Sequence, residues 1–306
     1  MDASIIVCTY NRADSLKDTL EALHKQQAVT CKDWEVIIVD NNSTDHTRQV
    51  VESVQQNWPE LHYVFEKNQG LSHARNLGIA CAKGEVILFT DDDVLPEPEW
   101  LETTFSGMNK YNADACGGFI APIWETQPPK WLTERFYGFL AVRTERSDDY
   151  PIVEPGQAPF GANMAFKKNV FEKVGLFDTS RGRKGKVLAS GEDGEMFERV
   201  LKAGLKSMFL GQSRVHHKVE SFRVTKRYFR RWRYQSSLNI AVSRGLSGER
   251  RLFNIPLYVF PQLLRATARM LWGKVTQASD EAFNREIVVF HFLGMMKGLF
   301  QSRKPI

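Results

Sequence analysis

The chain has 306 residues, of which 42% are hydrophobic and 25% charged, an ordinary globular composition with enough apolar material for a core. It contains no internal repeat, no low-complexity segment and no apolar stretch of the ~20 residues that would span a bilayer. The net charge of +5 is unevenly divided: residues 214–306 hold 18 Lys and Arg against five Asp and Glu, and the remainder holds 23 against 31. A basic C-terminal part is typical of contact with nucleic acid, an anionic membrane or a phosphate-rich substrate.

The N-terminus and the cysteines indicate the compartment. Residues 1–5 have no basic region and lead into no long apolar region, so we expect no secretory signal. The four cysteines are scattered and lack metal-ligand spacing, and Cys8 and Cys81 lie in apolar stretches where we expect them to be reduced and buried. These features predict a cytoplasmic protein.

Strand and helix patterns alternate over the first hundred residues. We expect strands at 4–8, 34–39, 63–65 and 85–90, and helices at 14–26, 45–56 and 72–82. Asp14 or Ser15 is the expected N-cap of the first helix. This order predicts an α/β fold with a Rossmann-like, mainly parallel sheet flanked by helices.

Polar clusters follow three of these strands, at residues 9–12, 40–43 and 91–93. Ligands bind beyond the carboxyl ends of the strands in such sheets, so three clusters at one edge favour a binding site. Asp91, Asp92 and Asp93 repel one another unless something neutralises them, and a divalent cation such as Mg²⁺ or Mn²⁺ has the required preference for oxygen ligands. The alternative is a solvated acidic turn.

The rest of the chain is less regular. Residues 108–160 are rich in Gly, Pro and aromatic residues, and helices are expected at 168–174 and 192–203. An arginine-rich segment at 223–244 precedes apolar stretches at 252–264 and 287–300. We therefore divide the chain into a domain of residues 1–220, with halves at 1–107 and 108–220, and a basic, apolar helical region at 221–306.

The arginine-rich segment has helical spacing, which could place Arg223, Arg227, Arg230 and Tyr234 on one face. No nucleic-acid-binding module is recognisable, so we expect no nucleic-acid partner. A helix at a membrane surface or facing phosphate suits the apolar stretches that follow. The alternative is a solvated helix packed by its aromatic residues.

Seven short motifs follow one another along the chain, at residues 4–12, 39–45, 68–78, 89–93, 161–166, 175–178 and 191–195. In this order they resemble a family 2 glycosyltransferase with the GT-A fold, and the resemblance covers residues 3 to 240. It implies inverting transfer of a sugar from a nucleotide diphosphate to a hydroxyl of a saccharide acceptor, with Mn²⁺ or Mg²⁺ as cofactor. The basic and apolar C-terminal region suggests a lipid-linked saccharide as that acceptor. The resemblance further implies polysaccharide biosynthesis for the cell envelope, at the inner face of the membrane.

The resemblance also implies roles for residues on the donor side. It assigns Asp91 and Asp93 to the metal, and Asp92 to the ribose or base. UDP is the commonest nucleotide in the family. The other expected donor contacts are Thr9, Tyr10 against the base, Asn11, Arg12, Asp40 at the nucleobase or ribose, and Arg75 at the diphosphate. Tyr10 could instead be a core or rim residue, Asp40 a turn cap, and Arg75 a surface helix residue.

On the acceptor side the resemblance places a general base at Asp193, with Glu192 beside it. Inverting transfer needs a carboxylate to take the proton of the attacking hydroxyl. The same two residues could satisfy the N-terminus of a helix, and both readings can hold together. His217 is a candidate third metal ligand, with a phosphate or acceptor contact and a structural histidine as alternatives.

Two other functions compete with this prediction. A sugar nucleotidyltransferase would need a glycine-rich basic loop after the first strand, whereas residues 9–14 contain no glycine. A non-catalytic nucleotide-sugar binder would lose the carboxylates for base and metal, and both sets are present.

Overall fold

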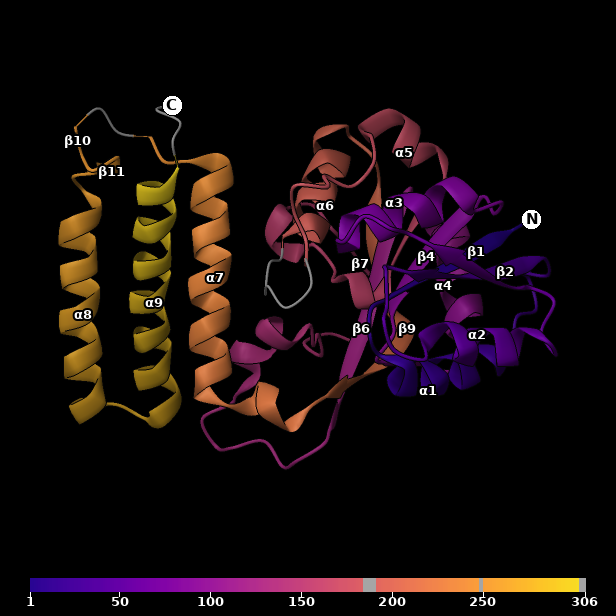
Figure 1. The fold of residues 1–306 in the computed structure, drawn as a ribbon, viewed down its shortest axis with the longest axis horizontal. Coiled ribbons are helices and arrows are strands. Elements are labelled where there is room, and N and C mark those ends of the chain that lie inside the picture. The colour runs from indigo at the N-terminus through magenta and orange to yellow at the C-terminus, as the bar shows by residue number, and fades with distance from the viewer. Residues whose placement is uncertain (184–190, 248–249, 303–306) are drawn as a thin grey trace. The chain divides into compact units, whose positions relative to one another are not determined.

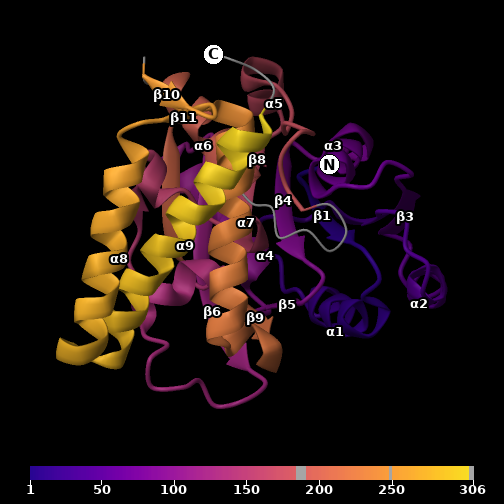
Figure 2. The ribbon, with the colours of Figure 1, turned by 60° about the vertical axis from the view of Figure 1, so that its left-hand side comes forward.

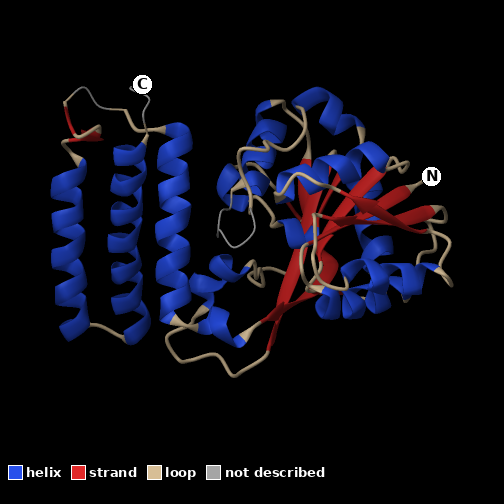
Figure 3. Cartoon of the chain, viewed as in Figure 1, coloured by secondary structure: helices blue, strands red, loops and turns tan. Residues whose placement is uncertain are grey.

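A computed structural model describes residues 1–183, 191–247 and 250–302. They form two compact units, which are coloured along the chain in Figure 1 and by secondary structure in Figure 3. The first unit contains residues 1–123, 141–183 and 191–218, and the second contains 124–140 and 219–302 apart from the undescribed pair.

The first unit is built on a nine-stranded mixed sheet. Its parallel half has the order β3-β2-β1-β4, with bounds Leu61–Phe65, Trp34–Asp40, Ala3–Thr9 and Val86–Asp91. The order continues through β8 (Met164–Lys167), β6 (Ala115–Trp124), β9 (Ser207–Val219) and β5 (Val94–Pro96), and β7 (Tyr150–Pro151) pairs with β9. The pairs β4–β8, β8–β6, β9–β5 and β9–β7 are antiparallel. The predicted α/β class is confirmed, and the first four strands of the chain form a parallel block.

Successive side chains of a strand point to opposite faces, and each face of the sheet has its own helices. On one face Ile5 and Val7 pack with α1 (Ala13–His24), α2 (Thr47–Gln55) and α4 (Trp100–Tyr111). On the other, Ile6 and Phe89 pack with α3 (Leu71–Cys81), α5 (Asn169–Val174) and α6 (Glu192–Lys202). Figure 2 shows helices on both sides of the strands. Burial on both faces explains the continuous apolar runs of the parallel strands.

Two local predictions are wrong. Helix α1 begins at Ala13 with Arg12 at the N-cap, and the amide of Ala13 donates to Asp45 Oδ2 at 3.2 Å. The expected cap from Asp14 or Ser15 is therefore replaced by a carboxylate from a loop that is distant in sequence. Cys81 is exposed at the end of α3, because the helix turns that position away from the sheet; all four cysteines are free.

The second unit contains three long helices that lie side by side in Figure 1: α7 (Lys226–Arg244), α8 (Val259–Thr276) and α9 (Ser279–Gln301). A hairpin of β10 (Arg251–Leu252) and β11 (Ile255–Pro256) precedes α8. Residues 124–140, which include the 3₁₀ helix η1 (Glu134–Leu140), pack on these helices through aromatic contacts, such as the edge-to-face pair of Trp131 and Phe283, whose ring centroids are 4.7 Å apart. Among the described helices, none has the length and apolar character to cross a membrane.

The arginine-rich segment does not form the single face that its spacing suggested. Thr225 caps α7 by accepting from the Tyr228 amide, so Arg223 lies before the helix, in the 3₁₀ turn η4 (Ser221–Val224). The Arg223 side chain is buried there. Arg230 pairs with Glu286 of α9 at 2.6 Å. Some of the positive charges of this segment are therefore buried or paired within the second unit.

Close packing of α9 on α7 depends on Gly294. A Cβ atom there would collide with the backbone carbonyl of Tyr234, which can yield only if the helix moves. We expect Gly294→Ala to lower the free energy of unfolding by about 1–3 kcal/mol, measured by denaturant titration. The control is Gly273→Ala in α8, where the nearest atom is the Arg285 side-chain Cδ at 2.9 Å and can move. Equal stability of the two variants would contradict this account.

Candidate active site

The three polar clusters meet at one edge of the sheet. Strand β1 pairs in parallel with both β2 and β4, and the register sets Thr9 beside Asp40 and Cys8 beside Asp91. The strand order therefore reverses direction at β1, which is the position where open α/β sheets bind ligands. The polar clusters therefore meet at one edge of the sheet, as expected. Thr9, at the end of β1, is buried there.

Hydrogen bonds between loops fix the backbone at this edge. Asn11 has a φ of 53°, and its side-chain oxygen accepts from the Thr44 amide at 2.7 Å. Asp40 is buried; Oδ1 accepts from the Ser43 amide at 2.9 Å and Oδ2 from the Tyr63 hydroxyl at 2.8 Å. Burial and the Asp40 carboxylate raise the pKa of Tyr63. Asp40 therefore does cap its turn, as the alternative interpretation required, whatever its role toward a nucleotide.

The acidic triplet is not a solvated turn. Asp92 and Asp93 are buried, and Asp91 is half-buried at the end of β4. Arg12 Nη1 lies 2.9 Å from Asp93 Oδ2, and Arg12 Nε lies 3.7 Å from Asp92 Oδ1. Burial raises the pKa of Asp92 to about 7, although the Arg12 guanidinium lowers it. Burial and the Asp93 charge likewise raise the pKa of Asp91. Tyr10, which stands between Thr9 and Asn11 in the sequence, is half-buried.

His217 lies beside the triplet because β9 pairs with β5, which sets His217 opposite Val94. Its buried ring places Nε2 at 3.4 Å from Asp93 Oδ1. Within the described residues, no three His, Cys, Asp or Glu side chains are grouped closely enough to enclose a metal ion. Mg²⁺ and Mn²⁺ often bind through one or two carboxylates and complete their shell with substrate phosphates and water, so Asp91 and Asp93 fit such an ion.

A second charged cluster forms around Arg75. This residue is 2% exposed, so the interpretation as a surface helix residue is wrong. Its Nη1 lies 2.5 Å from Asp193 Oδ1 and 3.3 Å from Glu192 Oε1, and its guanidinium carbon is 5.3 Å from the centroid of the Phe177 ring. Burial alone would lower the pKa of Arg75, but the carboxylates of Asp193 and Glu192 raise it.

Asp193 is held from two sides. Its Oδ2 accepts from the Gly161 amide at 2.8 Å, opposite the contact with Arg75. Residue 161 must be glycine for this approach, because a Cβ atom would collide with the Arg75 guanidinium. Glu192 and Asp193 also open α6, so they stand at a helix N-terminus as the alternative required. The Arg75 charge lowers the pKa of Asp91 and the Asp193 charge raises it, so the two clusters are close enough to interact electrostatically.

Glu192 gives this site a pH-dependent stability. Burial and the Asp193 charge raise the pKa of Glu192 from 4.5 to about 7, although Arg75 lowers it. Between pH 4.5 and about 7 the folded chain keeps a proton on Glu192 that the unfolded chain has lost. The contribution of Glu192 to the free energy of unfolding is therefore complete below pH 4.5 and is lost as the pH rises through about 7. We expect Glu192→Gln, which stays neutral, to flatten the fall in unfolding free energy between pH 5 and 8, a difference of about 3 kcal/mol.

Denaturant titrations across this pH range test the prediction. The control is Glu195→Gln on the same helix, since Glu195 pairs with Arg199 at 2.9 Å away from the cluster. Identical pH slopes for the two variants would show that Glu192 does not carry the effect.

Two asparagines that we did not predict organise the site. The Asn41 side chain donates to the Asn68 carbonyl at 2.7 Å and accepts from the Gly70 amide at 2.7 Å, which fixes the entry into α3. Asn163 accepts from Trp100 Nε1 at 2.9 Å and donates to the Ser213 carbonyl at 2.8 Å, which ties the turn before β8 to α4 and β9. Both lie inside recognised motifs, so motif membership was the available signal.

Comparison with known proteins agrees with this geometry. A family model described as Glycosyl transferase family 2 matches residues 4–175. The glucosyl-dolichyl phosphate glucuronosyltransferase of Haloferax volcanii is 31% identical over 232 residues, which cover 73% of this chain and 71% of that protein. Glycosyltransferase AglE of the same organism is 28% identical over 210 residues, covering 67% and 63%.

Solved structures share the fold. The mannosyltransferase PcManGT from Pyrobaculum calidifontis, in complex with GDP-Man and Mn²⁺, has a TM-score of 0.62 at 20% identity, covering 98% of this chain and 88% of that one. GalNAc-T7 with UDP, GalNAc and Mn²⁺ has a TM-score of 0.58 at 18% identity, covering 79% and 48%. With the family match over more than half its length, the chain belongs to glycosyl transferase family 2 and is a glycosyltransferase with the GT-A fold.

Proposed function

We propose that this glycosyltransferase moves a sugar from a nucleoside diphosphate to a hydroxyl of a lipid-linked saccharide, with inversion and with a divalent cation on the diphosphate. The observation that carries the proposal is the presence of two largely buried carboxylate clusters at the edge where β1, β2 and β4 end. The cluster of Asp91, Asp92 and Asp93 is suited to binding a cation and a diphosphate. The cluster of Glu192 and Asp193 is suited to accepting a proton. A nucleotidyltransferase or a simple binder would need only the first.

The second cluster supplies the base. In the proposed reaction an Asp193 carboxylate oxygen takes the proton of the acceptor hydroxyl as its oxygen attacks the anomeric carbon. The hydroxyl oxygen forms the new glycosidic bond, and the bond from the anomeric carbon to the diphosphate breaks. Arg75 and the Gly161 amide hold Asp193 in place, and Arg75 offsets its charge. Glu192 adds a buried carboxyl beside the half-buried Asp193.

The first cluster holds the donor. A divalent cation, when bound to Asp91 and Asp93, would offset the negative charge that grows on the leaving diphosphate. Arg12 lies against Asp92 and Asp93 and can turn toward phosphate oxygens. Thr9, Tyr10, Asn11 and Asp40 border the same edge as candidates for the nucleoside, and His217 for the cation or the phosphates.

Two observations support the choice of acceptor. The name of the Haloferax volcanii relative specifies glucosyl-dolichyl phosphate, a sugar on a lipid phosphate. The C-terminal region of this chain is basic, with 18 Lys and Arg against five Asp and Glu from residue 214. Both fit an enzyme that works at the cytoplasmic face of a membrane, with a UDP-sugar as the first donor to test.

A nucleotide-sugar panel tests the proposal. Melting temperature and release of nucleoside diphosphate are measured with Mn²⁺, with Mg²⁺ and with chelator. We expect one nucleotide to raise the melting temperature only with metal, and Asp93→Asn to remove that shift. The control is Asp178→Asn, because Asp178 bonds Ser180 and Arg181 outside the two clusters. No response to any nucleotide, with or without metal, would refute the donor assignment.

A further inference from the structure

Helix α8 presents an apolar face to solvent. Leu264, Leu271, Trp272 and Val275 are 72%, 58%, 68% and 85% exposed. Leu264, Leu271 and Val275 are seven and four residues apart, which places them on one side of the helix. The opposite side, through Val259, Ala266 and Gly273, is buried. Single exposed apolar residues are common, but a stripe along one helix marks a contact surface.

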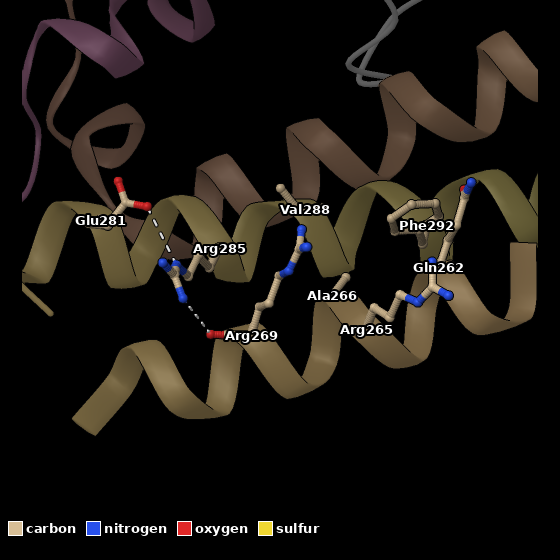
Figure 4. Close-up of a pocket in the computed structure, with 8 residues that line it drawn as sticks. All are labelled: Gln262, Arg265, Ala266, Arg269, Glu281, Arg285, Val288 and Phe292. Atoms are coloured by element: carbon tan, nitrogen blue, oxygen red, sulfur yellow. Dashed lines mark hydrogen bonds and ion pairs between the residues drawn. The ribbon is translucent and has the colours of Figure 1, made fainter. Parts of the chain in front are cut away.

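Cations border this stripe. Helix α8 carries Arg265, Arg269 and Lys274 and no Asp or Glu. A cleft of about 570 Å³ between α8 and α9 is lined by Arg265, Arg269, Arg285, Val288 and Phe292, with Glu281 at one end. Figure 4 shows Arg269 rising from α8 toward α9, and Arg285 reaching from α9 to Glu281 and to the Arg269 carbonyl.

The acidic residue of the cleft is already engaged. Glu281 pairs with Arg285 at 3.5 Å and also with Arg135. Within the described part of the chain, the guanidinium groups of Arg265 and Arg269 have no carboxylate partner. Two uncompensated guanidinium groups over apolar walls suit an anionic headgroup whose tail lies along the stripe.

We propose that α8 lies in the surface of a bilayer that contains anionic lipid, with its stripe among the acyl chains and lipid phosphates at Arg265 and Arg269. At 1.5 Å per residue its 18 residues extend about 27 Å along the membrane plane. Pairing of the stripe with a second copy of the chain would instead bring two sets of three cations together without a carboxylate on either helix. Charge therefore favours an anionic surface over self-association.

This surface deepens the proposed function, and its biological meaning rests on that function, because a lipid-linked acceptor is reached from the membrane. It also moves the expected membrane contact from the arginine-rich segment at 223–244 to α8. Binding to vesicles is measured without donor or acceptor, so its failure and the failure of the transferase proposal are separate results.

The test is flotation of the full chain with vesicles of phosphatidylcholine alone or with about 30% phosphatidylglycerol. We expect binding to the anionic vesicles at low salt and at least about tenfold weaker binding to phosphatidylcholine. Leu264→Gln with Leu271→Gln removes apolar surface without adding charge and should weaken binding about tenfold or more. Arg265→Gln with Arg269→Gln should weaken it about 25-fold and reduce its dependence on salt.

Matched controls are Val153→Gln, at a valine that is 71% exposed in the first unit, and Arg48→Gln, at an exposed arginine paired with Glu52. Both should bind as the unchanged chain does. Because all substituted side chains are exposed, the melting temperatures should also be unchanged. Equal binding by the stripe variant, or no binding to anionic vesicles, overturns the proposal. A dimer in sedimentation that Leu271→Gln dissociates, without vesicle binding, would assign the stripe to a second copy instead.

Discussion

Asp193→Asn is expected to lower kcat by about 10²–10⁴-fold while donor binding stays within about threefold of the unchanged enzyme. The amide has nearly the shape of the carboxylate and can still accept from Gly161, which lies 2.8 Å from Oδ2, but it cannot take a proton from the acceptor. Steady-state transfer and calorimetric binding of the donor measure the two quantities.

The control for this substitution is Glu195→Gln, two residues further along α6 and paired with Arg199. It should keep kcat within about twofold. Both melting temperatures are measured first, because Asp193→Asn also removes an ion pair of Arg75. If kcat of the folded Asp193→Asn enzyme fell by less than tenfold, another group would be the base.

The parallel half of the sheet could be predicted because its signals are local. Strands β1, β2 and β4 are unbroken apolar runs, and the polar residues that end each run, Thr9, Asp40 and Asp91, come together through simple β-α-β topology. The antiparallel half could not be predicted in this way. Strands β6 and β8 are paired across long sequence separations, and their Gly, Pro and aromatic content has no clear period.

The ion-pair partners of the site residues could not be predicted from the sequence either. Asp91, Asp92 and Asp93 were recognisable, but the cation beside them, Arg12, was expected only as a contact of the nucleotide sugar. Arg75 and Asp193 are 118 residues apart, and nothing in either motif indicates that they form an ion pair. Charge compensation in a core is set by packing between elements, so sequence shows which charges need a partner and not which partner each receives.

Arg75→Met is expected to lower the free energy of unfolding by about 3–5 kcal/mol at pH 8, because it leaves Glu192 and Asp193 without a buried cation. Methionine has similar length and keeps an apolar contact with Phe177, so little of the loss should come from a cavity. The loss should be smaller at pH 5, where Glu192, whose pKa burial raises to about 7, is protonated. Denaturant titration at both pH values measures it, and Arg48→Met, at an exposed ion pair, should cost less than about 1 kcal/mol.

A triple variant separates charge from packing. In Arg75→Met with Glu192→Gln and Asp193→Asn, no charge of the cluster remains, although the change in shape at residue 75 is the same. If unpaired charge causes the instability, the triple variant should recover most of the lost free energy at pH 8 while remaining inactive, since it lacks the base. If it is as unstable as Arg75→Met alone, the guanidinium stabilises the fold through its contacts with Phe89 and Phe177. Recovered stability without activity would show that Arg75 offsets the charges of Glu192 and Asp193, of which the proposed reaction needs Asp193 as its base.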